Sequence, residues 1–137
     1  MSVRVDGWQT KYNVAVAAMS EWPFKWGEHD CITFAARIAD AITGAHYLED
    51  VREKYQWASA LEALRAINDA GGLEAMITEF LGDPVPWGWC TTGDVVLATN
   101  RDGGEIVAVM DSHYLLAPEE TRLGGLPLHA AIKGWRL

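Results

Sequence analysis

The chain has 137 residues, half of them apolar, which is enough for one domain with a single hydrophobic core. Its formal net charge of −8 argues against a nucleic-acid surface and against docking on an anionic membrane. No apolar run approaches the roughly 20 residues of a membrane span, and the N-terminus lacks the apolar core of a signal peptide. We therefore expect synthesis in the cytoplasm, no nucleic-acid partner and no membrane span.

The first half of the chain carries helical patterns. Leu61, Leu64 and Ile67 share one helix face, and Gly44 is a typical residue at which to end a helix. Spacings of three and four between apolar residues predict helices over residues 8–19, 32–43, 59–70 and 73–81, with a shorter helical turn within 45–57.

A loop rich in Pro and Gly, residues 82–88, precedes a strand-forming half. Apolar runs predict strands over residues 95–98, 105–110 and 113–116, then a helical turn within 128–133 and a last strand at Trp135. Asp94 is expected to accept backbone N–H groups in the turn before its strand. Helices followed by antiparallel strands define an α+β fold. We expect a single domain over residues 1–137, with a helical N-terminal half packed on a small antiparallel sheet.

Cys31 stands where a helix is expected to begin. Asp30, just before it, is a favourable N-cap residue. The dipole and the unpaired N–H groups of a first helical turn favour a thiolate, and cysteine nucleophiles are placed in this way. Cys31 is thus a candidate nucleophile, and the alternative is a small buried hydrophobic residue. Cys31 and Cys90 lie far apart in the sequence, and in a chain made in the cytoplasm we expect two free thiols rather than a disulfide.

Three motifs and their order carry a family resemblance. They are residues 24–31 (FKWGEHDC), 93–97 (GDVVL) and 135–137 (WRL). Together they resemble the NlpC-type cysteine hydrolases that cut cell-wall peptides, and more narrowly a small family of phage and prophage tail-associated proteins within that superfamily. The resemblance implies a papain-like NlpC fold with the Cys31 helix packed on the sheet. It also implies other phage tail proteins as partners and a place in the virion tail after assembly in the host.

The catalytic base that this resemblance implies is missing. In NlpC-type enzymes a His begins the strand after the Gly-Asp strand, and Ile106 stands there in this chain. Glu105 is adjacent, but neighbouring strand residues point to opposite faces. The candidate substitutes are His113, at the start of the next expected strand, and His29, two residues before Cys31. The alternatives are an exposed His113 and a loop His29 that bonds a backbone carbonyl.

Two hypotheses of function follow. The first is a structural or assembly protein of a phage tail tip, with a degenerate hydrolase-like fold in which Ile106 lies opposite Cys31. The second is an active cysteine hydrolase that binds peptidoglycan and cleaves its peptides with Cys31 and a relocated His. A thiol protein of unrelated role is a third.

Some side chains outside the motifs bear on partners. Trp87 and Trp89 are candidate interface anchors, because aromatic residues on loops suit such contacts, and they can also close over a small core. The acidic pair Glu119-Glu120 is a solvated face or meets a basic partner surface. The His residues show no metal-ligand spacing, so we expect no metal and no cofactor.

Overall fold

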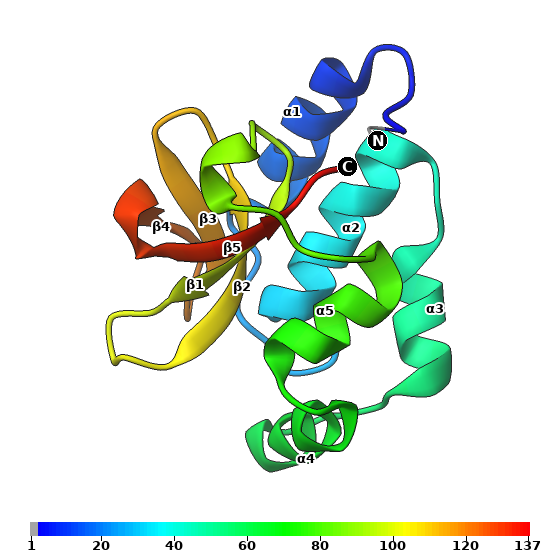
Figure 1. Cartoon of the computed structure of the whole chain (residues 1–137), viewed down its shortest axis with the longest axis vertical. Coiled ribbons are helices and arrows are strands. Elements are labelled where there is room, and N and C mark those ends of the chain that lie inside the picture. Colours follow the sequence, from blue (N-terminus) through cyan, green and yellow to red (C-terminus); the bar gives the residue numbers. More distant parts are fainter. Residues whose placement is uncertain (1–2) are drawn as a thin grey trace.

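Helices fill the first part of the chain and strands the second, in a computed structural model that describes residues 3–137 (Figure 1). This order confirms the expected α+β class. The helices of the described residues are α1 (Trp8–Met19), α2 (Cys31–Thr43), α3 (Tyr47–Lys54), α4 (Ala60–Ala70) and α5 (Leu73–Leu81), followed by the 3-10 turn η1 (Trp87–Trp89). The strands are β1 (Val95–Thr99), β2 (Glu105–Met110), β3 (Tyr114–Pro118), β4 (Leu123–Pro127) and β5 (Ala131–Trp135), with a second 3-10 turn, η2 (Leu128–Ala130), before β5.

The strands form one antiparallel sheet in the order β4-β3-β2-β1-β5. Figure 1 shows a strongly curved sheet on one side of the molecule and helices α2, α3 and α5 on the other. Helix α2 packs on β2 and β3, which brings the start of α2 to the sheet. No helix within residues 3–137 is both long and apolar enough to cross a membrane.

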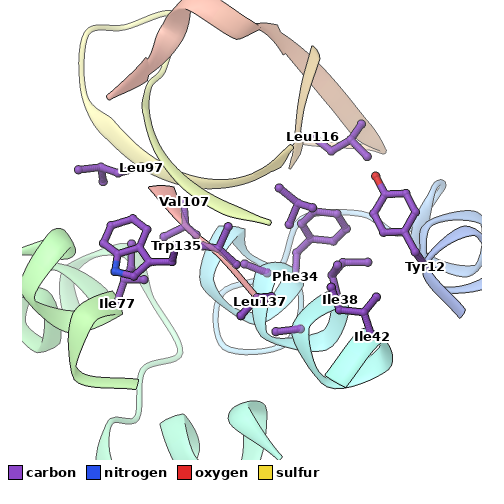
Figure 2. Close-up of a cluster of buried hydrophobic side chains, with 14 of the residues drawn as sticks. Tyr12, Phe34, Ile38, Ile42, Ile77, Leu97, Val107, Leu116, Trp135 and Leu137 are labelled. Atoms are coloured by element: carbon purple, nitrogen blue, oxygen red, sulfur yellow. The ribbon is translucent and has the colours of Figure 1, made fainter. Parts of the chain in front are cut away.

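The main core lies between α2 and one face of the sheet. Side chains of α2, among them Phe34 and Ile38, meet Val107 and Leu116 from the strands, as Figure 2 shows. Alternate strand residues point to the opposite face, where a second buried cluster includes Val96, Ala98, Ala108, Met110 and Leu115. Both faces of the sheet are therefore apolar, which explains the unbroken apolar runs of β1 and β2.

Several element boundaries differ from the expectation. The third strand begins at Tyr114 rather than at residue 113, so His113 lies in the turn before it. The expected helical turn within 128–133 covers only Leu128–Ala130, and Ala131 onwards is strand. Strand β4 was not predicted, because Gly124, Gly125 and Pro127 are typical of loops. Its pairing with β3 depends on the rest of the sheet, which no local pattern reveals.

Helix α4 buries a different face from the one its leucines suggest. Leu61 and Leu64 are 57% and 54% exposed, whereas Ala63 and Ala66 are buried. Helix α4 lies at one end of the molecule and packs against α5 (Figure 1). Alanines at this contact let the two helices approach closely, so the short side chains turn inward and the long ones remain at the surface.

A buried ion pair between Arg4 and Asp94 ties the N-terminal segment to the turn before β1, and Arg4 also reaches the C-terminal residue. Arg4 Nη2 lies 2.7 Å from Asp94 Oδ1, and Arg4 also donates to the carbonyls of Thr92 (2.7 Å) and Leu137 (3.1 Å). The backbone N–H of Leu137 donates to the same Asp94 oxygen at 2.9 Å, and that of Thr91 to the other oxygen at 2.9 Å. Asp94 therefore accepts turn N–H groups as expected, and it also links two of the sequence motifs, residues 93–97 and 135–137.

Candidate functional site

Cys31 is the first residue of α2, as its sequence context predicts. Asp30 is the N-cap residue, and its Oδ1 accepts the backbone N–H of Thr33 at 2.9 Å. In return, the Thr33 hydroxyl accepts the backbone N–H of Asp30 at 2.8 Å. This reciprocal capping box fixes the first turn of α2 and with it the direction of the Cys31 side chain.

The same aspartate also organises the segment that leads into α2. Asp30 Oδ2 accepts the backbone N–H of Gly27 at 2.9 Å and the indole N–H of Trp57 at 2.7 Å. Gly27 has a φ of 81°, and a Cβ at this position would overlap the carbonyl oxygen of Trp57. The Gly and Asp of the Trp-Gly-x-x-Asp-Cys motif are thus both required by the fold around Trp57.

The Cys31 thiol faces the sheet in a desolvated environment. Burial raises its pKa to about 11, and this effect outweighs the N–H groups of Val107, Ile32 and Cys31 itself, which act to lower it. The first-turn position favours a thiolate, whereas burial of the thiol acts in the opposite direction and is the larger effect. Both Cys31 and Cys90 are free thiols, as expected.

Cys31 and Ile106 both line one cleft of about 360 Å³. Cys31 packs against the main core, whereas Ile106 packs against the second buried cluster on the other face of the sheet. No His within residues 3–137 contributes to its walls. The other residues around the cleft are Phe24, Trp26, Asn100, Arg101, Asp102, Ala117, Pro118, Glu119, Gly124, Gly125 and Leu126.

The two candidate substitute bases lie outside this cleft. His113 is exposed, in the turn that precedes β3. His29 is only 3% exposed, and its ring meets the edges of Trp22 and Phe34 at centroid distances of 5.2 and 6.1 Å. Neither ring nitrogen has a hydrogen-bond partner among the described residues, so the expected bond to a backbone carbonyl is not formed. Burial and the nearby charge of Arg37 lower the pKa of His29.

Charged side chains at the rim of the cleft were not assigned to the site from the sequence. Arg101, in the β1–β2 turn, places Nη2 3.8 Å from Glu119 Oε1 and 3.4 Å from the carbonyl oxygen of Gly125. The Glu119 carboxylate lies over Gly124, where any Cβ would overlap it. Asp102 adds a second carboxylate. The Gly124-Gly125 pair was the available signal, since glycine in a strand often marks a close approach of another group.

The two loop tryptophans differ in environment. Trp87 is half-buried and packs against the second core cluster, so it contributes to the fold. Trp89 is 62% exposed. Of the two interface candidates, Trp89 is therefore the one whose ring is available to a partner.

The fold and the site define an α+β domain with a cysteine at the start of a helix, packed on an antiparallel sheet and open to a cleft without histidine in the described residues. The family described as "Domain of unknown function (DUF6950)" matches residues 3–137, and the chain belongs to that family. No curated protein and no solved structure gives a significant match to the chain.

Proposed function

We propose that this chain is a structural or assembly protein of a phage or prophage tail tip, built on an NlpC-like fold whose cysteine site does not cleave peptides. The order of the three motifs supports the tail-associated family. The observation that carries the non-catalytic site is Ile106, which lines the Cys31 cleft at the position where the resemblance implies a histidine.

The chemistry of the site supports this proposal. Cysteine hydrolysis of a peptide requires a thiolate and a group that takes up and returns a proton. Burial raises the pKa of the Cys31 thiol to about 11, which disfavours the thiolate at pH 7. An isoleucine side chain cannot accept the proton. Cys31 is therefore a half-buried residue that lines the cleft, and the role of the cleft is to bind a partner rather than to cleave a substrate.

A role in assembly requires a surface for partners, and Trp89 supplies a candidate anchor. Its exposed ring lies on a short 3-10 turn. Truncation of such a tryptophan, when it is central to an interface, typically costs about 2 kcal/mol or more of binding free energy. Trp89→Ala should reduce incorporation into particles, whereas Trp22→Ala, which removes another exposed tryptophan, is the matched control.

The decisive experiment measures digestion of purified peptidoglycan by the wild-type chain and by Cys31→Ala. We expect no release of peptides from either protein above the buffer control. A digestion that disappears in Cys31→Ala would overturn the proposal in favour of the hydrolase hypothesis. Analysis of muropeptides by mass spectrometry would then identify the bond that is cut.

A further inference from the structure

The Cys31 cleft is apolar inside and charged at its rim. Its inner surface includes the half-buried side chains of Cys31, Ile106 and Leu126. Phe24 and Trp26 form one wall, with ring centroids 4.7 Å apart in an edge-to-face arrangement. A cavity of this composition suits an aliphatic side chain, because burial of apolar surface is the main source of affinity there.

The rim carries more negative than positive charge. Asp102 and Glu119 contribute two carboxylates, and Arg101 contributes one guanidinium. Arg101 is 3.8 Å from Glu119, and its side chain is 73% exposed, so the ion pair is loose and open to exchange with solvent. Within residues 3–137, Asp102 forms no ion pair with its carboxylate.

Glycine at position 124 keeps one of these carboxylates at the cleft. The Glu119 side chain lies over Gly124 in space that a Cβ would occupy. Any other residue at position 124 would displace it.

From these features we propose that the cleft docks a segment of a partner protein in which an aliphatic residue is followed by a lysine. The aliphatic side chain fills the apolar interior, and the ammonium group pairs with Glu119 and Asp102 at the rim. Charge complementarity favours such a partner, since the whole chain carries a net charge of −8. This inference rests on the proposed function in that it treats the cleft as a binding site.

The test is an NMR titration of the full-length, ¹⁵N-labelled chain at low ionic strength. The probes are the peptide acetyl-Ala-Leu-Lys-Ala-amide and the same peptide with Gln in place of Lys. We expect shifts of the Gly124 and Gly125 amides and of the Trp26 indole N–H. The lysine peptide should bind about fivefold more tightly than the glutamine peptide, the size of a partly exposed ion pair, and added salt should reduce this preference.

Three variants localise the effect. Glu119→Gln should remove most of the preference for lysine, whereas Glu120→Gln, the same charge change at the adjacent exposed residue, should retain it. Gly124→Ala should also remove the preference, because it keeps the charge of Glu119 but moves the carboxylate. Each variant is first compared with the wild-type chain by its amide spectrum, so that a loss of fold is recognised.

Equal affinity for the two peptides, or a preference that persists in Glu119→Gln, would overturn this inference. Cleavage of either peptide, followed by mass spectrometry, would contradict the proposed function instead. The comparison of lysine with glutamine decides the docking inference whether or not cleavage occurs.

Discussion

The ion pair between Arg4 and Asp94 offers a sharp test of how the chain ends stabilise the domain. The side chains of Arg4 and Asp94 are 8% and 2% exposed, so solvent contributes little to their stabilisation. In Asp94→Asn the volume is conserved, but Arg4 retains a buried positive charge without its counter-ion. The asparagine amide would also present a donor where Arg4 and two backbone N–H groups now find acceptors.

The expected cost is large in relation to the stability of such a domain. Removal of one partner of a buried ion pair costs about 3–5 kcal/mol, against a total of about 5–15 kcal/mol for a typical domain. At roughly 3–5 °C per kcal/mol for a chain of this size, the midpoint of thermal unfolding should fall by about 10–25 °C. Arg4→Met should cost less, because Asp94 still accepts the N–H groups of Thr91 and Leu137.

Urea unfolding followed by circular dichroism measures these free energies, and thermal unfolding gives the midpoints. Asp83→Asn, the same change at an exposed aspartate, serves as the control and should shift stability by less than about 0.5 kcal/mol. The double variant Arg4→Met/Asp94→Asn completes a cycle whose coupling energy should be about 1–3 kcal/mol. If Asp94→Asn costs less than about 1 kcal/mol, the reasoning from burial is refuted.

Three further predictions concern the segment before α2 and the cleft. Burial lowers the pKa of His29, so the folded state binds a proton on this ring less tightly than the unfolded chain does. The wild type should therefore lose stability as pH falls below about 6.5. In urea unfolding at pH 7 and pH 5, His29→Phe should reduce that loss. Gly27→Ala, at a positive φ with no room for a Cβ, should cost about 1–3 kcal/mol, whereas Gly88→Ala, which meets no atom within 4 Å, should be nearly neutral in the same assay. Ile106→His should place an imidazole in the cleft and raise the rate of Cys31 alkylation by iodoacetamide at pH 7 about tenfold; an unchanged rate would mean that position 106 does not face the thiol.

The parts of the fold that the sequence predicts are those set by local chemistry. The bounds of α1 and α5 agree with the expected ranges, and α2 begins at its predicted cap, because capping and helical periodicity act within a few residues. Strand β4 and the buried face of α4 could not be predicted from such local patterns. The glycines of β4 are stabilised only through pairing with β3, and the alanines of α4 are buried only because α5 lies against them.

The candidate site likewise has parts that the sequence predicts and parts that it does not. The shared cleft of Cys31 and Ile106 could be anticipated from the resemblance, which aligns both positions with a nucleophile and its base. The raised pKa of the Cys31 thiol could not, since it depends on how the packed sheet and the start of α2 desolvate the sulfur. The approach of Arg101 to Glu119 was equally hidden, because the two residues come from different turns and meet only when the sheet curves.

The motifs that carry the family resemblance have structural roles that do not depend on catalysis. Gly27 and Asp30 are fixed by their contacts with Trp57, and Asp94 is fixed by the ion pair with Arg4 and by the backbone of Leu137. Loss of any of these groups would destabilise the domain, so selection for a stable fold is enough to retain them. The presence of these motifs therefore follows from what stabilises this domain, and it does not by itself indicate activity.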